Sequence, residues 1–320
     1  MYKIGVIDTM NHKGIDLLKS SKDFNVDVVT DLSRKNLIKV LPKYDGVTLR
    51  RGKLDSEILK NCKNLKVIAR HGVGYDNVDI KYCKENNITL LVTHNSTSTS
   101  PAEHIMFMIL NIYKGKEMFD RIVRSGKFHE AIHLEINENF EVFNKKILII
   151  GFGRIGRKLI KKCLGFEMHV SVYDPYVDEK IVKSLGGKKI INLESGLKNA
   201  DIVSISVPLN KETRNMISSN EISLMKKNSI IINVARGGVV NEKDLSNALN
   251  RNIIFAAGLD VFEKEPPDLD NPLLKNKRVL LSPHAATFTK ECLENMSVET
   301  AQNIIDFFNG KIEKTKIVNL

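Results

Sequence analysis

Three residues in the second half of the chain have the side chains needed for proton and charge chemistry on a carbonyl group. Arg236 follows the apolar run IIINVA, Glu265 lies in DVFEKEPP, and His284 follows VLLSP. A guanidinium polarises a carbonyl and binds a carboxylate through two parallel hydrogen bonds. An imidazole carries a proton near neutral pH, and a neighbouring carboxylate favours its charged, donating form. The set predicts reduction of a 2-oxo acid, although each residue alone is equally typical of a surface or loop position.

A glycine-rich turn precedes these residues. Gly151, Gly153 and Gly156 form G-x-G-x-x-G between the apolar run KKILII and the helix-like RKLIKKC. In a dinucleotide-binding turn the first glycine allows the tight turn, the second admits the pyrophosphate, and the third lets helix and strand pack closely. Asp174 ends the next apolar run, where a carboxylate binds the ribose hydroxyls and repels a 2′-phosphate. The pattern predicts NAD rather than NADP. A simple turn role for Asp174, before Pro175, is the less favoured interpretation.

The elements that must position these residues alternate in type along the chain. Apolar, β-rich runs are followed by helix-length amphipathic segments, which predicts parallel sheets covered on both faces. We expect strands at 3–7, 26–30, 46–50, 65–71 and 88–92, and, after the glycine-turn strand and the strand that ends at Asp174, at 200–208, 229–238, 255–262 and 278–284. Ligands of such sheets bind beyond the carboxyl ends of strands, where Arg236, Glu265 and His284 all lie.

The length of 320 residues predicts two domains. The polar stretch THNSTSTS at 93–100 separates the two strand series, and a long helix is expected over 101–126. A final helix at 291–311 can return to the first domain. We therefore predict one domain from 1–100 and 287–320, and a second from 101–286.

Composition argues against several other classes of protein. The net charge of +11 comes from lysines that are interleaved with acids, and the chain contains no Trp for base stacking, so we expect no nucleic-acid partner. The sequence contains neither a signal-peptide pattern nor an apolar stretch long enough to cross a membrane. The four cysteines are scattered without C-x-x-C, which indicates free thiols in a reducing cytoplasm.

Taken together, several motifs in order show that the chain resembles the D-isomer-specific 2-hydroxyacid dehydrogenase family, including its phosphoglycerate dehydrogenase-like members, over nearly its full length. These motifs are HGVGYDNVD (71–79), STSPAEH (98–104), ILIIGFGRIGRKL (147–159), YDP (173–175), ADIVSISVPLNKETRNMI (200–217), INVARGGVV (232–240), AAGLDVFEKEPP (256–267) and SPHAA (282–286). The resemblance implies two Rossmann- or flavodoxin-like domains, with the substrate-binding domain built from both chain ends. The family pattern departs at 93–97 (THNST), at Pro101 and at Phe152. We expect no regulatory domain after the last helix.

Roles for individual residues follow from the same resemblance. It implies that Arg236 binds the substrate carboxylate and that His284 is the acid and base, paired with Glu265. Backbone amides around Val73 and Gly74 are implied to bind the substrate carboxylate, and Asp260 to lie near the nicotinamide carboxamide. The implied cofactor-binding residues are Gly151, Gly153, Arg154, Ile155, Gly156, Asp174, Val207, Pro208, Thr213, Val234, Ala235 and Asp260. A homodimer formed through the NAD-binding domain, with the helix after Pro101, is also implied.

The prediction of which 2-hydroxy acid is the substrate rests on cationic residues at the ends of two strands of the first domain. Arg50 and Arg51 follow one strand, and Arg70 and His71 follow another. If Arg50 and Arg70 face the substrate, their positive charges suit a small, doubly charged anion. This interpretation favours 3-phosphoglycerate and 3-phosphohydroxypyruvate as substrates. Hydroxypyruvate or glyoxylate reduction is the alternative.

Two other classes of function compete with this interpretation. His129–His133 reads HEAIH, which fits the H-E-x-x-H pattern of zinc metallopeptidases. Its context is poor, because a glycine lies three residues before it and no third ligand follows, so we predict no metal site. A protein that only senses NAD(H) would not need Arg236, Glu265 and His284, which are all present.

Overall fold

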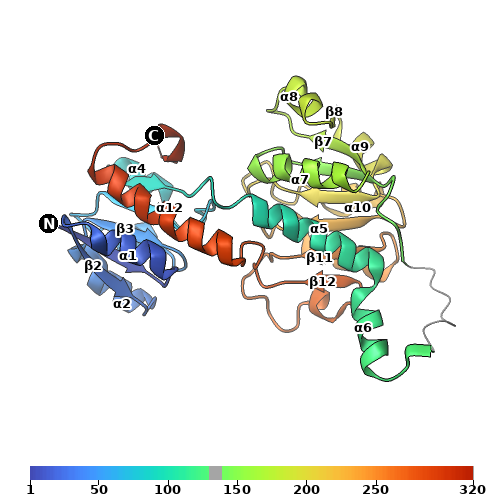
Figure 1. Cartoon of the computed structure of the whole chain (residues 1–320), viewed down its shortest axis with the longest axis horizontal. Helices are drawn as coiled ribbons and strands as arrows, with labels where there is room; N and C mark the ends of the chain where they lie inside the picture. The colour runs from blue at the N-terminus through green and yellow to red at the C-terminus, as the bar shows by residue number, and fades with distance from the viewer. Residues whose placement is uncertain (130–138, 320) are drawn as a thin grey trace. The chain divides into compact units, whose positions relative to one another are not determined.

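The structure is a computed structural model that describes residues 1–129 and 139–319 (Figure 1). It divides into two compact units, one formed by residues 1–98 with 287–320 and the other by residues 99–286. The division lies within two residues of the boundaries expected from the sequence. Each unit is a parallel α/β sheet, so the predicted fold class is confirmed.

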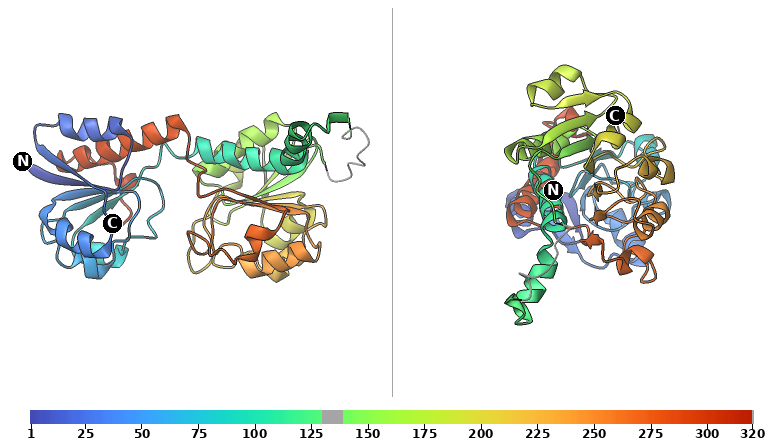
Figure 2. Two further views of the ribbon diagram at one scale, coloured as in Figure 1. Left: turned by 90° about the horizontal axis from the view of Figure 1, so that it is seen from below. Right: turned by 90° about the vertical axis from the view of Figure 1, so that its right-hand side faces the viewer.

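Unit 1 contains a five-stranded sheet in the order β2-β1-β3-β4-β5, with every neighbouring pair parallel. Its strands are β1 (Tyr2–Ile7), β2 (Phe24–Val29), β3 (Gly46–Leu49), β4 (Val67–Arg70) and β5 (Thr89–Leu91). Its helices are α1 (His12–Ser20), α2 (Arg34–Val40), α3 (Ser56–Leu59), α4 (Ile80–Glu85) and α12 (Lys290–Phe308). Figure 2 shows α1 and α12 on one face of this sheet and the other helices on the opposite face.

Unit 2 contains a seven-stranded parallel sheet in the order β12-β11-β10-β9-β6-β7-β8. Its strands are β6 (Lys146–Ile150), β7 (His169–Tyr173), β8 (Lys188–Ile190), β9 (Ile202–Ile205), β10 (Ile230–Asn233), β11 (Ala256–Leu259) and β12 (Val279–Leu281). Its helices are α5 (Thr99–Lys114), α6 (Lys116–Arg124), α7 (Arg154–Gly165), α8 (Glu179–Ser184), α9 (Leu193–Asn199), α10 (Ser219–Ser223) and α11 (Glu242–Asn250).

The central strands are mostly apolar because helices cover both faces of each sheet. In β6, Ile147 and Ile149 pack into one core while Leu148 and Ile150 pack into the other. Side chains alternate across a strand, so a strand covered on both sides is apolar at most positions. The apolar pattern therefore indicates a layer of helices on each face of the sheet.

Two features depart from the sequence prediction. The helix expected over 101–126 is broken at Gly115, whose φ is +58°, and a Cβ there would lie 2.8 Å from the Asn139 Oδ1. Because only glycine adopts this conformation without penalty, the chain turns into α6 (Figure 1). The edge strand β8 was not expected, since its sequence KKI is short and contains two lysines.

The order of strands locates a switch point in each unit. In unit 1 the chain runs outward from β1 to β2 and then resumes at β3, on the other side of β1. In unit 2 it runs from β6 through β7 to β8 and resumes at β9. Connections leave in opposite directions at such a point, and the crevice beyond the strand carboxyl ends is where these folds bind ligands.

Candidate active site

The glycine turn lies at the switch point of unit 2, between β6 and α7. Gly151 has a φ of +91°, and a Cβ there would lie 2.7 Å from the Ser206 carbonyl oxygen. At Gly156 a Cβ would lie 2.6 Å from the Gly151 carbonyl oxygen, so only glycine lets the helix approach the strand. At Gly153 nothing lies within 4 Å of an added Cβ. The turn therefore packs tightly on the protein side and is open where a pyrophosphate would approach, which fits a dinucleotide.

Asp174, which follows β7, is bonded to this turn. Its Oδ2 accepts the N–H of Phe152 at 2.7 Å, and its Oδ1 accepts the N–H of Tyr176 at 2.9 Å. A carboxylate has about four acceptor sites, so both oxygens keep capacity for further donors such as ribose hydroxyls. Asp174 thus holds the turn in shape while presenting negative charge beside it.

Glu265 and His284 meet beyond the carboxyl ends of the neighbouring strands β11 and β12. The His284 Nδ1 lies 2.7 Å from the Glu265 Oε2. Because an ionised carboxylate only accepts, the Nδ1 carries the proton of this bond, and the Nε2 is left to exchange a proton elsewhere. The other Glu265 oxygen accepts the N–H of Phe262 at 3.1 Å, which fixes the carboxylate.

The surroundings of Glu265 keep it ionised. Burial acts to raise its pKa, but the hydrogen bond from His284, the charges of His284 and Arg236, and the Phe262 N–H together lower it below its ordinary value. The Glu265 carboxylate therefore stays ionised near neutral pH.

Arg236 lies in the loop after β10, and its positive charge helps to lower the pKa of Glu265. The buried Asn233, at the end of β10, shapes this loop. Its Nδ2 donates to the Arg236 carbonyl at 2.9 Å and its Oδ1 accepts the Ala235 N–H at 3.0 Å. At Gly237 a Cβ would lie 1.8 Å from the Phe262 carbonyl oxygen, so the loop rests directly on the segment that leads to Glu265. Sequence reasoning missed Asn233, whose only signal was a polar residue ending a buried strand.

The remaining predicted cofactor residues lie at the carboxyl ends of the same strands, in loops or at the start of α7. Val207 and Pro208 follow β9, and the Thr213 Oγ1 donates to the Pro208 carbonyl at 2.6 Å, which closes that loop into a fixed turn. Val234 and Ala235 lie between β10 and Arg236, while Arg154 and Ile155 begin α7. Asp260 follows β11 and is fully buried, with 0% of its surface exposed.

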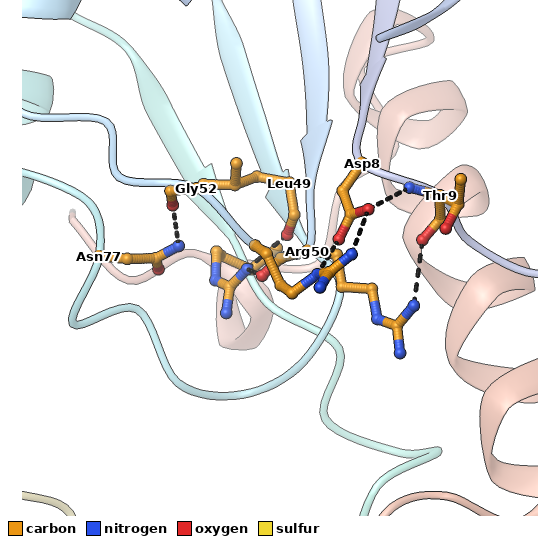
Figure 3. Close-up of polar contacts among 8 residues, drawn as sticks. Asp8, Thr9, Leu49, Arg50, Gly52 and Asn77 are labelled. Atoms are coloured by element: carbon orange, nitrogen blue, oxygen red, sulfur yellow. Dashed lines mark hydrogen bonds and ion pairs between the residues drawn. The ribbon is translucent and has the colours of Figure 1, made fainter. Parts of the chain in front are cut away.

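In unit 1, Arg50 directly follows β3 (Figure 3), and Arg70 is the last residue of β4. Arg70 binds backbone oxygens: its Nε donates to the Gly74 carbonyl at 2.7 Å, and its Nη1 donates to the carbonyls of Leu49 at 2.5 Å and Arg50 at 2.6 Å. These bonds tie the loop containing Val73 and Gly74 to the end of β3. The contacts favour a role for Arg70 in shaping the loop rather than in binding substrate directly.

Asp8, at the end of β1, forms an ion pair that the sequence did not indicate. Arg51 donates to both its carboxylate oxygens, at 2.6 and 3.1 Å, and the Thr9 N–H donates at 2.7 Å (Figure 3). Burial acts to raise the Asp8 pKa, but Arg51, the Thr9 N–H and Arg50 outweigh it and lower the value. The adjacent Arg50 donates to the Thr9 carbonyl at 3.4 Å, a long contact, and its guanidinium lies over the Phe288 ring.

Comparison with known proteins agrees with this geometry. Residues 106–286 match the family described as D-isomer specific 2-hydroxyacid dehydrogenase, NAD binding domain. The chain belongs to this family. The resemblance noted in the sequence is thereby confirmed, and unit 2 carries the NAD-binding domain of a D-2-hydroxyacid dehydrogenase family member.

Relatives differ in the substrate that their names give. The chain is 35% identical to D-3-phosphoglycerate dehydrogenase of Archaeoglobus fulgidus over 96% of this chain and 58% of that protein. It is 34% identical to glyoxylate reductase of Korarchaeum cryptofilum over 92% of this chain and 90% of that one. D-lactate dehydrogenase from Aquifex aeolicus, solved with NAD and lactic acid, shares 29% identity and superposes with a TM-score of 0.88 over 99% of both chains. The chain thus spans somewhat over half the length of the phosphoglycerate dehydrogenase and most of the glyoxylate reductase.

Two further sequence predictions concern a metal site and a membrane-spanning helix. The HEAIH motif extends into residues 130–138, which lie outside the described residues. Among residues 1–129 and 139–319, no three His, Cys, Asp or Glu side chains gather as metal ligands. None of the helices in these ranges has the length and apolar content required to cross a bilayer.

Proposed function

We propose that the protein is an NAD-dependent D-2-hydroxyacid dehydrogenase, which transfers a hydride between the nicotinamide and C2 of a small 2-hydroxy or 2-oxo acid. The observation that carries the proposal is the contact between Glu265 and His284 at 2.7 Å, in the unit that contains the dinucleotide turn. A histidine paired with a carboxylate is the proton donor that reduction of a carbonyl requires. A protein that only sensed NAD(H) would have no need of this pair.

In this reaction the residues of the site have separate roles. Bound NAD supplies or accepts the hydride, and the turn at Gly151–Gly156 with Asp174 would hold it. Arg236 binds the substrate carboxylate and polarises the carbonyl, so that charge developing on its oxygen is stabilised. The His284 Nε2 delivers the proton to that oxygen in reduction and removes it in oxidation, while Glu265 stabilises the imidazolium. Backbone N–H groups of Val73 and Gly74 would bind the substrate carboxylate, in a loop that Arg70 shapes.

For the substrate, we propose 3-phosphoglycerate and 3-phosphohydroxypyruvate. Arg50 is the guanidinium best suited to a second anionic group, because Arg51 is committed to Asp8 and Arg70 to backbone carbonyls. Glyoxylate or hydroxypyruvate reduction is the alternative, supported by the glyoxylate reductase of Korarchaeum cryptofilum, whose length the chain covers almost fully. Formation of a homodimer and cytoplasmic location stay predictions.

A substrate panel with saturating NADH tests this proposal. We expect turnover of 2-oxo acids, with the highest kcat/KM for 3-phosphohydroxypyruvate among that compound, hydroxypyruvate, glyoxylate and pyruvate. Arg50→Gln should raise KM for 3-phosphohydroxypyruvate about 10- to 100-fold, because a charge-assisted hydrogen bond contributes about 1.5–3 kcal/mol. KM for glyoxylate should stay within about twofold, since that substrate has no second anionic group to lose the contact.

Lys39→Gln, on the exposed surface of α2, removes the same charge elsewhere in unit 1 and should leave both constants unchanged. An equal effect of Arg50→Gln on both substrates would contradict the second-anion role. A preference for glyoxylate in the unaltered protein would favour the alternative reaction. No turnover of any 2-oxo acid, with NADH bound, would favour the sensor.

A further inference from the structure

A completely buried carboxylate, that of Asp260, contacts the backbone next to His284, the proposed acid–base residue. Asp260 follows β11 and has 0% of its surface exposed, although ionised side chains are rarely buried without partners. The chemistry proposed above assigns it no proton or hydride. A buried carboxylate that a protein retains must be satisfied by several donors, and the position of those donors indicates what it does.

The donors belong to the segment that carries His284. The Asp260 Oδ1 accepts the N–H of Ala285 at 2.7 Å, and the Oδ2 accepts the N–H of Ala286 at 2.9 Å. The backbone carbonyl of Asp260 accepts the N–H of His284 itself at 2.7 Å. Three consecutive N–H groups thus point at one residue.

This arrangement accounts for an unusual backbone conformation. His284 has a φ of +53°, in the left-handed region that side chains other than glycine seldom adopt. A strained conformation persists where its surroundings hold it, and it often marks a functional position. The bonds to Asp260 hold the residue in this conformation, and in the same conformation its ring meets Glu265.

A second layer supports the carboxylate. The Ser282 Oγ donates to the Asp260 Oδ1 at 2.5 Å, and the His104 Nε2, from α5, lies 2.9 Å from the same hydroxyl and 3.6 Å from the carboxylate. Because the serine proton is given to Asp260, the hydroxyl oxygen accepts from the His104 Nε2–H. Burial lowers the His104 pKa, and the Asp260 charge opposes this only partly, so the ring is a neutral donor near pH 7. Ser100 adds a further bond, from its Oγ to the Ala286 carbonyl at 2.6 Å.

Serine, histidine and aspartate together are also the residue types of an acyl-transfer site, but this arrangement does not fit that chemistry. A nucleophilic serine needs a histidine nitrogen that accepts its proton, and a carboxylate bonded to the other ring nitrogen. Here a single nitrogen of His104 faces both the serine and the aspartate. His104, Ser282 and Asp260 therefore have a structural role. They support the segment from Ser282 to Ala286.

We propose that Asp260, with Ser282 and His104 behind it, is a positioning group that holds His284 in its left-handed conformation with its ring against Glu265. The inference rests on the function proposed above for His284. It adds Ser282 and His104 to that site, and it gives Asp260 a positioning role, exerted through the backbone of the segment, besides its implied place near the nicotinamide carboxamide.

Amide hydrogen exchange and kinetics of two variants test the proposal. Asp260→Asn should speed exchange of the Ala285 and Ala286 amides about tenfold or more, because an amide group cannot accept from both N–H groups and the serine as the carboxylate does. Ser282→Ala removes only the second layer and keeps the carboxylate, so it remains informative if the first variant does not fold. It should lower kcat about tenfold, since small displacements of a catalytic group have effects of this size. The NADH Kd of Ser282→Ala should change far less than kcat, because the glycine turn and the Asp260 carboxylate are both unaltered in this variant.

The solvent deuterium isotope effect on kcat separates positioning from general loss of stability. A misplaced His284 makes proton transfer slower relative to the other steps, so the isotope effect should rise in Ser282→Ala above its value in the unaltered protein. Ser229→Ala is the matched control, because Ser229 is a buried serine whose hydroxyl donates to the Lys226 carbonyl just before β10, at the opposite end of the strands from Ser282. It should change neither exchange at 284–286 nor the isotope effect.

Amide exchange, kcat and the isotope effect together distinguish the possible outcomes. Faster exchange confined to 284–286, together with lower kcat and a larger isotope effect, supports the positioning role. Unchanged exchange overturns it, and so does faster exchange with kcat and isotope effect unchanged. If the unaltered protein reduces no 2-oxo acid, the proposed function fails, and exchange at 284–286 in Asp260→Asn alone then decides whether Asp260 holds the segment.

Discussion

Replacing His284 by alanine is expected to lower kcat for 2-oxo acid reduction by about three orders of magnitude, within the range that a general acid contributes. The reason is the loss of the Nε2 proton donor, which Glu265 orients through the Nδ1 contact at 2.7 Å. The NADH Kd should be almost unchanged, because the glycine turn lies after another strand, β6. Steady-state kinetics and a fluorescence titration with NADH measure the two quantities.

Two further variants sharpen this result. His169→Ala removes an exposed histidine at the start of β7, at the opposite end of the strands, and should retain full activity. Imidazole added to His284→Ala should restore part of the rate, since it can enter the vacated position and carry a proton. If His284→Ala keeps more than about a tenth of the activity, the acid–base role is wrong.

Replacing Arg236 should produce a loss of similar size. Arg236→Ala is expected to lower kcat/KM about 1000-fold, because both the carboxylate contact and the stabilisation of charge on the carbonyl oxygen are lost. Arg236→Lys keeps the charge but not the planar pair of donors, so a loss of about 100-fold is expected. Initial rates over a range of 2-oxo acid concentrations give these values.

Arg251→Ala is the matched control, because Arg251 is an exposed arginine that caps the end of α11 in the same unit. Its kcat/KM should equal that of the unaltered protein. Full activity in Arg236→Lys would mean that a point charge suffices, and the two-pronged binding of the substrate carboxylate would have to be abandoned.

Much of the fold followed from the sequence because its physical cause is repetitive. The central strands are apolar at most positions, since helices cover both faces of each sheet, and this pattern is readable without coordinates. The contact of Glu265 with His284 follows similarly, because the two residues lie in the loops that follow β11 and β12, which are neighbours in the sheet. The edge strand β8 lacks such a pattern, since water can solvate its lysines.

Contacts that depend on loop conformation were not readable in the same way. Asn233, Asp260 and Asp8 each bind backbone N–H groups or an arginine in loops whose φ and ψ no residue pattern specifies. The break in the long helix at Gly115 is a similar case, because an isolated glycine is compatible with a continuous helix. These are the residues that shape the site rather than those that react.

Transfer of deuterium tests the central claim most directly. The protein is given NADH deuterated at the transferred position of C4, together with the best 2-oxo acid of the panel, and the product is examined by proton NMR and chiral chromatography. We expect a D-2-hydroxy acid with deuterium at C2, one atom for each NADH consumed. A product with ordinary hydrogen at C2, or the L isomer, would contradict it.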